Sequence, residues 1–318
     1  MPLGEFDLIE RYFRRASPRR DVLLGVGDDA ALLEVPPGRA LVAATDTLVE
    51  GRHFLPAAPP RSIGHQALAV NLSDLAAMGA EPAWALLSLS LPEPDERWLA
   101  GFADGFFALA DASGVALVGG DTVRGPLVVT VEVLGFVEPA RALTRSGARP
   151  GDALYVSGSL GDSAAGLATL LRGGACAASD DPLVRRHLFA QPRLALGQAL
   201  AGIATAGMDV SDGLLGDLHK LCAASGVGAT LDLDSLPLSE ALVSRHSPEE
   251  CEKFAVHGGD DYELLFTLPA DRPFPGESAS GELPRLTRIG RITAGRGVRC
   301  TRGGTEVAVS STGYDHFR

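Results

Sequence analysis

Aspartates at the ends of apolar runs are the residues of this sequence best suited to chemistry. The first two, Asp28 and Asp29, stand between apolar runs in residues 22–33, with Gly25 and Gly27 beside them. Adjacent carboxylates repel each other, and a core strand would have to desolvate both. Glycine lets the backbone turn tightly and approach another group closely. A bound cation is the simplest reason for such a pair.

The arrangement of apolar run, turn and aspartate recurs along the chain, at Asp28, Asp29, Asp46, Asp74, Asp121, Asp209 and Asp212. Hard divalent cations prefer oxygen ligands, and Mg²⁺ often joins carboxylates to substrate phosphates. Taken singly, each aspartate is more often a helix cap or a turn residue. Seven in similar contexts favour a metal site assembled from distant segments.

Two glycine-rich segments, residues 119–121 and 158–161, are candidates for turns whose backbone amides hold phosphate. Arg124 and Arg145 follow such segments and are able to neutralise phosphate charge. An isolated arginine is more often a solvated surface residue, and that interpretation is preferred for Arg124. His53, shortly after Asp46, is either a capping residue or a ligand.

Composition narrows the function classes. The net charge of -12 argues against a nucleic-acid partner. The only lysines, Lys220 and Lys253, stand outside any Walker A loop or protein-kinase lysine motif. Phosphate chemistry would therefore use metal ions, arginines and backbone amides. The four cysteines lack zinc-ribbon spacing. Since neither a signal-peptide pattern nor a membrane-spanning apolar run is present, we expect a cytoplasmic protein.

The elements that position these residues follow from periodicity. A helix is predicted over residues 62–78, capped by Ser62 and ended by Gly79, with Asn71 and Asp74 on one face. Buried strands are predicted over 40–44 and 115–118, each ending just before its aspartate turn. Other predicted helices cover residues 5–13, 96–113, 163–171, 194–200 and 214–224, and other strands cover residues 83–91, 127–137, 153–156, 230–233 and 262–268.

Residues 149–152 form a turn-rich boundary, which predicts an N-terminal domain of residues 1–148 and a C-terminal domain of residues 149–318. Residues 173–181 and 273–284 are predicted to be loops. The irregular alternation of strands and helices favours two α+β or mixed-sheet domains over a regular barrel.

Segments along the whole chain closely resemble bacterial thiamine-monophosphate kinases, at residues 25–32, 45–54, 69–80, 119–122, 143–148, 209–214 and 258–264. The run Asn-Leu-Ser-Asp-Leu-Ala-Ala-Met-Gly-Ala at 71–80 resembles the wider aminoimidazole-ribonucleotide-synthetase-like, or PurM-like, superfamily. The Thr-Asp and His-Phe pairs within residues 45–54, and Gly-Tyr-Asp-His-Phe at 313–317, are similar to the kinases in particular.

The resemblance implies a two-domain PurM-like α+β fold. Its N-terminal domain would bind ATP and magnesium and form a barrel-like dimer interface, and its C-terminal domain would carry a mixed sheet flanked by helices. Several Mg²⁺ ions would be held by Asp29, Thr45, Asp46, Asp74, Asp121, Asp209 and Asp212. In the first pair, Asp29 is then the ligand, and Asp28 either shapes the turn or pairs with an arginine. ATP would contact Gly120, Asp121, Arg145 and Ser211, and thiamine monophosphate would contact His53, Asp260 and Tyr314.

Two positions depart from the family pattern. Ala44 replaces a frequent Ser or Thr, so a side-chain ligand is missing there, and Asp260 replaces a frequent Glu that is one methylene longer. The implied reaction produces thiamine diphosphate, the last step of its biosynthesis. A phosphate has a second pKa of about 6, so the acceptor is largely deprotonated and no protein base is expected. Mg²⁺ would bridge the phosphates and assist in-line transfer.

Two alternatives stay open. A sibling ATP-dependent synthetase, forming an amidine or selenophosphate, would share the superfamily motifs. The selenophosphate enzyme is expected to carry a reactive cysteine near its N-terminus, whereas the first cysteine here is Cys176. A non-catalytic protein that binds divalent cations would need neither Arg145 nor Tyr314.

Overall fold

The computed structural model describes residues 4–173, 180–272 and 283–309, which fold into two compact units. The first comprises residues 1–75 and 80–139, and the second comprises residues 76–79 and 140–318. Most of the two predicted loops, residues 173–181 and 273–284, lies outside the described residues, as does the segment 313–317. In the described ranges, no helix has the length and apolar character needed to cross a membrane.

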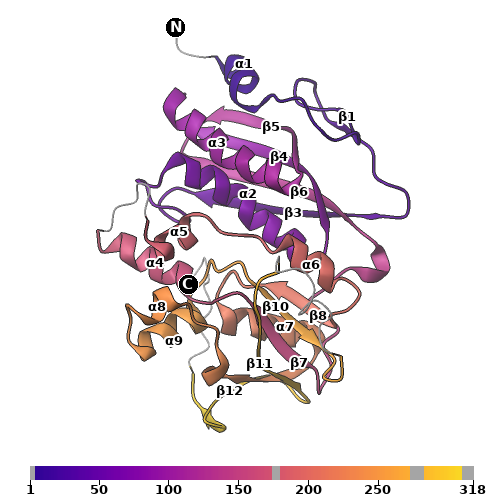
Figure 1. Cartoon of the computed structure of the whole chain (residues 1–318). Coiled ribbons are helices and arrows are strands. Elements are labelled where there is room, and N and C mark those ends of the chain that lie inside the picture. The colour runs from indigo at the N-terminus through magenta and orange to yellow at the C-terminus, as the bar shows by residue number, and fades with distance from the viewer. Residues whose placement is uncertain (1–3, 174–179, 273–282, 310–318) are drawn as a thin grey trace. The chain divides into compact units, whose positions relative to one another are not determined.

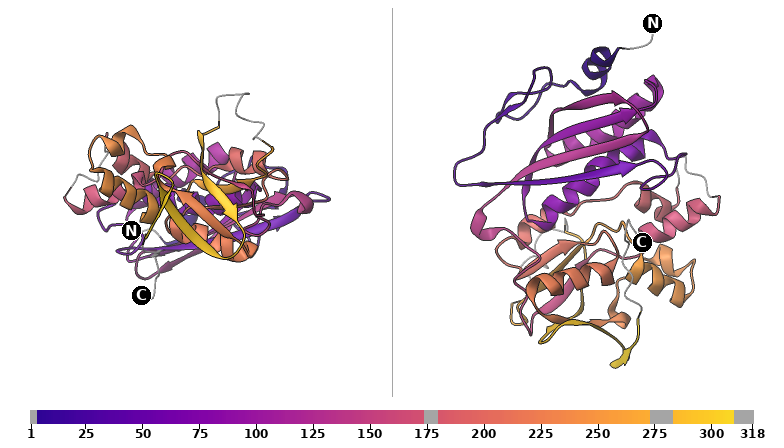
Figure 2. Two further views of the ribbon diagram at one scale, coloured as in Figure 1. Left: turned by 90° about the horizontal axis from the view of Figure 1, so that it is seen from below. Right: turned by 180° about the vertical axis from the view of Figure 1, so that it is seen from behind.

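The first unit is built on a four-stranded sheet in the order β3-β6-β4-β5. Its strands are β3 (Ala40–Val49), β4 (Glu81–Leu91), β5 (Ala116–Arg124) and β6 (Val128–Val137). Helices α2 (Pro60–Ala77) and α3 (Glu96–Ser113) cover one face (Figure 1), and the view from behind shows the sheet in front of them (Figure 2). Beneath the helices, β6 buries a valine at every second position, at Val129, Val131 and Val133.

The opposite face of this sheet is more polar. Partners in the ladders place Thr47, Thr130, Ser88 and Asp121 in one row across all four strands. At one end of this face, a hairpin of β1 (Val22–Leu24) and β2 (Leu32–Leu33) packs on a cluster around Trp84 and Phe136. Two large apolar side chains on the outer strands stay exposed, Leu41 by 46% and Val123 by 49%.

Three details of the first unit differ from the sequence predictions. The strands predicted over 40–44 and 115–118 run on to Val49 and Arg124, because ladder pairing continues through the polar residues. Ser62 is not the cap of α2, which begins at Pro60; its hydroxyl donates to the Pro59 carbonyl. The segment 5–13 divides into α1 (Glu5–Leu8) and a π-helical turn (Ile9–Phe13), which bury Leu8 and Phe13 and leave Phe6 82% exposed.

The second unit contains, in its described part, a seven-stranded sheet in the order β13-β12-β9-β11-β7-β10-β8. The strands are β7 (Ala153–Ser157), β8 (Ala206–Asp209), β9 (Gly228–Asp232), β10 (Leu264–Leu268), β11 (Leu286–Thr293), β12 (Gly297–Arg302) and β13 (Thr305–Val307). The sheet is mixed, since β12 pairs with β9 in parallel and the other pairs are antiparallel.

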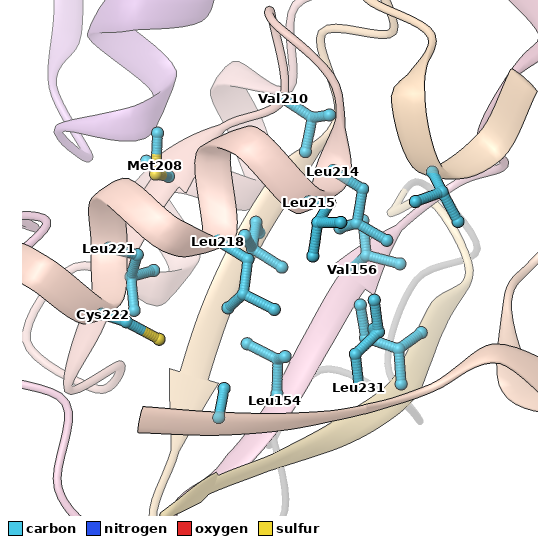
Figure 3. Packing of buried hydrophobic residues seen from close by; sticks show 14 of the residues in the cluster. Leu154, Val156, Met208, Val210, Leu214, Leu215, Leu218, Leu221, Cys222 and Leu231 are labelled. Carbon is cyan, nitrogen blue, oxygen red and sulfur yellow. The ribbon is translucent and has the colours of Figure 1, made fainter. Parts of the chain in front are cut away.

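Helices flank this sheet, namely α4 (Asp162–Leu171), α5 (Pro182–Leu188), α6 (Leu194–Leu200), α7 (Leu214–Ser225), α8 (Glu240–Val243) and α9 (Pro248–His257). Leucines 214, 218 and 221 recur at helical spacing along α7 and pack over Leu154 and Leu231 of the sheet (Figure 3). This core confirms the prediction of a C-terminal mixed sheet flanked by helices.

Glycine allows α2 and α3 to pack closely. A Cβ atom on Gly64 of α2 would lie 2.0 Å from the Phe102 carbonyl oxygen, and one on Gly105 of α3 would lie 1.8 Å from the Arg61 carbonyl oxygen. Backbone atoms cannot move aside as a flexible side chain does, so this contact excludes any larger residue. The contact fixes α2, and with it Asn71 and Asp74, on the sheet.

We predict that Gly105→Ala lowers the free energy of unfolding by about 1–3 kcal/mol, the usual cost of overpacking. Gly101→Ala on the same helix is the matched control, since the nearest neighbour of its Cβ would be the Pro60 side chain at 3.2 Å, and the nearest backbone atom would be Arg61 N at 3.7 Å. It should change stability by less than about 1 kcal/mol, because alanine also favours the helix. Urea unfolding of both variants measures the difference, and equal effects would contradict the close contact.

Candidate functional site

Thr45 and Asp46 lie inside β3, at an edge of the first sheet. Asp46 stands opposite the buried Val131, whereas Thr45 stands opposite Glu132. Because ladder partners share a face, Asp46 belongs to the helix-covered face and Thr45 to the open face. The Thr45 hydroxyl donates to the Val131 carbonyl oxygen at 3.1 Å. Its lone pairs still allow the same oxygen to accept or ligate.

Asp121 lies on β5, at the other edge of the same sheet. It pairs with Ser88 on the open face, and the ladders place Gly120, its neighbour, in the row of Asp46. Three strand spacings of about 4.8 Å separate β3 from β5, roughly 14 Å. Asp46 and Asp121 therefore occupy opposite edges and opposite faces, and one cation cannot bind both within a single chain.

The two glycine-rich segments are not open phosphate-binding turns. Residues 119–121 are part of β5, where a Cβ on Gly120 would lie 1.8 Å from the Leu87 carbonyl oxygen. In residues 158–161, the amides of Gly158, Leu160 and Gly161 donate to Arg285 O, Pro237 O and Asp261 Oδ2. The predicted use of these amides for phosphate is wrong for 158–161, since protein acceptors already occupy them.

Helix α2 presents Asn71 and Asp74 three residues apart, as predicted. The Asn71 amide nitrogen donates to the Ala67 carbonyl at 3.0 Å, which fixes the orientation of the amide group. Its oxygen is fully buried and has no hydrogen-bond partner in the part of the chain that the structure describes. Asp74 is half-buried one turn further on. An unsatisfied buried oxygen beside a carboxylate suits an additional cationic or donor group.

Asp28, Asp29 and His53 lie in turns of the first unit. Asp28 Oδ1 accepts from the Asp29 amide at 2.8 Å, the contact of a side chain that shapes the turn. Asp29 is exposed. His53 Nδ1 accepts from the Val49 amide at 3.0 Å, so His53 caps the end of β3. This bond assigns the ring proton of the neutral histidine to Nε2, which is then a donor.

The second unit brings several predicted residues together. Asp209 ends β8 and is buried, and Ser211 and Asp212 follow directly. The Asp260 amide donates to Ser211 O at 2.9 Å, and the Tyr262 amide donates to Val210 O at 2.9 Å. Residues predicted to bind magnesium, ATP and thiamine monophosphate therefore lie in two adjoining loops, 209–212 and 258–263.

Lys220 and Asp217 are functional candidates that the sequence analysis missed. Asp217 Oδ2 accepts from the amides of Ser211 and Asp212, at 2.9 and 3.0 Å. Lys220 donates to Asp212 at 2.5 Å and to Asp217 at 2.8 Å. Burial raises the pKa of Asp217, while bonds to Lys220 partly offset it. The sequence signal was Lys220 three residues after Asp217, on the side of α7 that faces Asp212.

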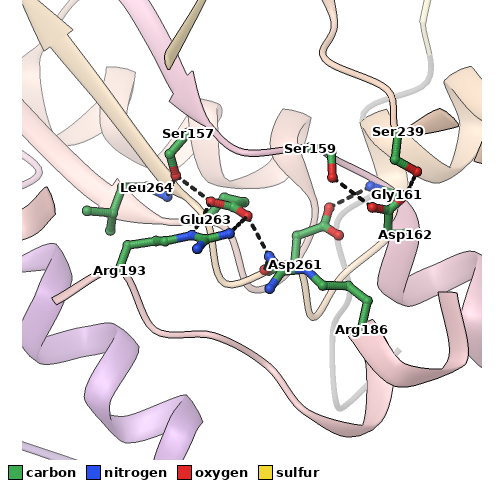
Figure 4. A network of polar contacts seen from close by, with 10 residues as sticks. All are labelled: Ser157, Ser159, Gly161, Asp162, Arg186, Arg193, Ser239, Asp261, Glu263 and Leu264. Atoms are coloured by element: carbon green, nitrogen blue, oxygen red, sulfur yellow. Dashed lines mark hydrogen bonds and ion pairs between the residues drawn. The ribbon is translucent and has the colours of Figure 1, made fainter. Parts of the chain in front are cut away.

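A second missed group surrounds Glu263, whose side chain is 1% exposed (Figure 4). Arg193 binds it with two bonds, Nε to Oε2 at 2.7 Å and Nη2 to Oε1 at 2.5 Å. Arg186 Nη2 and the Ser157 hydroxyl each donate to it at 2.5 Å. We name Ser157, Arg186, Arg193 and Glu263 the Glu263 clamp. It joins the end of β7, the α5–α6 region and the loop 258–263.

Asp261 is fully buried beside this clamp. Burial raises the pKa of Asp261 well above its usual range, and the bond from the Gly161 amide, 2.8 Å long, offsets this only in part. Oδ1 of Asp261 has no hydrogen-bond partner among the described residues. Burial therefore favours the neutral form of this carboxyl group.

The remaining predicted residues are Arg145 and Tyr314. Arg145 is exposed, and its carbonyl oxygen accepts from the Ser225 hydroxyl at 2.9 Å. Tyr314 lies outside the described residues.

The side chains predicted to hold magnesium fit the ion by their chemistry. All are carboxylates or a hydroxyl, the hard oxygen donors that Mg²⁺ prefers, and the unsatisfied Asn71 oxygen adds another. Within residues 4–173, 180–272 and 283–309, no three His, Cys, Asp or Glu side chains gather in a way that could hold a metal ion. Mg²⁺ usually retains waters and uses one or two carboxylates with substrate phosphates.

Models of two protein domains match the chain. Residues 27–137 match the AIR synthase related protein N-terminal domain, and residues 149–303 match the AIR synthase related protein C-terminal domain. The chain is 50% identical to the thiamine-monophosphate kinase of Escherichia coli (strain K12) over 322 residues, which cover 100% of this chain and 99% of that protein.

Solved structures are similar as well. The thiamine-monophosphate kinase of Stenotrophomonas maltophilia K279a has a TM-score of 0.87 and 48% identity, covering 94% of this chain and 97% of that one. A structure of AaThiL complexed with AMPPCP and TMP has a TM-score of 0.77 and 34% identity, covering 99% of this chain and 97% of that one.

We predict that Asp261→Asn becomes more stable relative to the wild type as pH rises. The folded pKa of Asp261 is raised, so above the unfolded value of about 3.9 the unfolded chain has lost a proton that the folded chain keeps. The wild type then loses up to about 1.4 kcal/mol per pH unit until the folded pKa is reached, and the neutral amide does not. Urea unfolding between pH 4.5 and 8 measures this. A difference independent of pH would show that Asp261 is ionised.

Proposed function

Because the chain belongs to the thiamine-monophosphate kinase family, it phosphorylates thiamine monophosphate to thiamine diphosphate, and we propose that it does so by direct in-line transfer from ATP assisted by Mg²⁺. The identity of 50% over the whole chain carries the assignment. A sibling synthetase of the superfamily would share the fold but not this full-length identity with the kinases.

The proposed metal ligands are Asp29, Thr45, Asp46, Asp74, Asp121, Asp209 and Asp212. Their support is the match of oxygen donors to magnesium and the buried Asn71 oxygen beside Asp74. Magnesium, when bound, neutralises phosphate charge and stabilises the transferred group. The Asp212 carboxylate is paired with the Lys220 ammonium group. If Asp212 binds a magnesium ion instead, the ammonium group of Lys220 is able to bind phosphate.

We propose that ATP contacts Gly120, Asp121, Arg145 and Ser211, and that thiamine monophosphate contacts His53, Asp260 and Tyr314. The exposed Arg145 supplies the fork of donors that suits phosphate. The Val49 amide donates to Nδ1 of His53, so Nε2–H is the donor of the neutral ring. The acceptor is a phosphate oxygen that is largely deprotonated at neutral pH, so the residues bind and orient the substrates and none has to remove a proton.

We also propose that the protein is a homodimer, with residues 1–148 as its ATP- and magnesium-binding and dimerisation domain and residues 149–318 as its C-terminal domain. Both outer strands of the first sheet, β3 and β5, carry exposed apolar side chains. Long open edges favour pairing with another chain. A barrel closed by two such sheets would place each edge of one sheet beside an edge of the other, which compensates for the separation of Asp46 and Asp121 in one protomer. A cytoplasmic location stays a prediction.

We predict that Asp46→Asn and Asp74→Asn each lower the rate of thiamine diphosphate formation by about 100-fold or more, the scale of losing one key electrostatic contact. Each removes a charged oxygen ligand while keeping the size of the side chain. The assay follows product from ATP, MgCl₂ and thiamine monophosphate, with circular dichroism to check the fold. Asp28→Asn is the matched control, since its amide oxygen still accepts from the Asp29 amide. A near-wild-type rate in Asp46→Asn or Asp74→Asn would remove that residue from the metal site.

We predict that Leu41→Arg or Val123→Arg converts the dimer to a monomer of about 33.0 kDa, because a buried unpaired charge at the interface is costly. Light scattering after size-exclusion chromatography gives the mass. Leu171→Arg, at the end of α4 in the second unit and 66% exposed, is the control and should stay dimeric. A monomeric wild type would refute the dimer.

A further inference from the structure

The loop 258–263 holds two side-chain-bearing residues in a backbone conformation that usually requires glycine. Asp260 has φ of 64° and Tyr262 has φ of 49°, both in the left-handed region. Such residues persist only where the surrounding structure determines the backbone strongly. The contacts of this loop therefore hold its backbone in this unfavourable conformation, and Asp260 is one of the residues that they hold.

Three backbone groups of the loop are held from outside it. The amides of Asp260 and Tyr262 donate to Ser211 O and Val210 O, each at 2.9 Å. On the other side, Arg186 Nη2 donates to the carbonyl oxygen of Asp261 at 2.7 Å. The loop is thus fixed between the residues that follow β8 and the guanidinium group on α5.

The Glu263 clamp fixes the end of the loop. Glu263 accepts two bonds from Arg193 in a planar fork, one from Arg186 and one from Ser157. The Ser157 hydroxyl in turn accepts from the Leu264 amide at 2.9 Å. A Cβ atom on Gly158 would lie 2.2 Å from Glu263 Oε1, so the carboxylate occupies space that only a glycine at this position leaves open. Charge-assisted bonds of this kind set both distance and angle.

Tyr262 connects the fixed backbone of the loop to the side chain of Asp260. Its hydroxyl donates to Asp260 Oδ1 at 3.0 Å, and Tyr262 is buried. A short aromatic side chain has few rotatable bonds, so a buried tyrosine places its hydroxyl within narrow limits. The direction of the Asp260 carboxylate then follows from the backbone that the Glu263 clamp fixes.

We propose that Tyr262 and the Glu263 clamp are positioning residues that aim the Asp260 carboxylate at the cationic ring of thiamine monophosphate. The inference rests on the proposed function, in which Asp260 contacts that substrate. A carboxylate attracts the positive charge of a thiazolium ring, and the shorter side chain of Asp, compared with Glu, makes the contact more sensitive to the backbone beneath it. Neither Tyr262 nor the clamp touches the reacting phosphates in this assignment.

The test uses the full-length protein with two variants. Tyr262→Phe removes only the hydroxyl, and Arg193→Lys keeps the charge but loses the two-bond fork. We expect KM for thiamine monophosphate to rise by about 10-fold in each, the effect of losing a hydrogen bond to a charged group. KM for ATP should change by less than about two-fold on the same reasoning, because ATP makes no contact with Asp260 in the proposal.

Arg185→Lys is the matched control, because Arg185 is the exposed neighbour of Arg186 on α5, outside the clamp. It should keep both KM values. Melting temperatures of all variants separate positioning from stability. Equal changes in the KM values of both substrates, or unchanged KM values in Tyr262→Phe, would overturn the positioning proposal. In that case, a wild type that is active on thiamine monophosphate would leave the proposed function intact. A wild type inactive on thiamine monophosphate would overturn both.

Discussion

The buried carboxylate of Glu263 is the interaction on which the loops of the second unit depend. A charge with 1% exposure is costly unless charged partners and hydrogen bonds compensate it, and two guanidinium groups and a hydroxyl do so here. Removing one partner of such a group generally costs more than forming the pair stabilises. The chain must therefore keep β7, the α5–α6 region and the loop 258–263 together. Asp260 and Tyr262 depend on that constraint for their backbone conformation, and the loop 209–212 is bonded to theirs.

The same electrostatic requirement organises the other aspartates. Asp217 is buried and shares Lys220 with Asp212, whereas burial raises the pKa of Asp261 and favours its neutral form. Most of the carboxylates proposed to bind magnesium lie at exposed or half-buried positions, as at Asp29, Asp46 and Asp121, whereas Asp209 is buried. Burial thus distinguishes Asp217 and Asp261 from most of the aspartates proposed to bind magnesium.

Much of the fold was predictable where the local pattern was strong. The helices over α2, α3, α6 and α7, and the strands β4, β6 and β7, followed from apolar periodicity and from Gly79 at the end of α2. The strands through Asp46 and Asp121 were predicted too short, because an open sheet face accepts polar residues that the pattern alone assigns to turns. The Glu263 clamp was not predictable, since Ser157 and Arg186 stand 106 and 77 residues from Glu263.

The alternation of faces along β3 makes its register with β6 decide on which face of the sheet Asp46 lies. Leu48 is buried opposite Val129, two positions after Asp46, and it holds the strand in this alignment. A slip by a single residue would exchange the two faces. Asp46 would move to the open face with Glu132 and Thr130, and Leu48 would lose its place in the core. One leucine in the core thus decides on which side of the sheet the proposed ligand Asp46 lies.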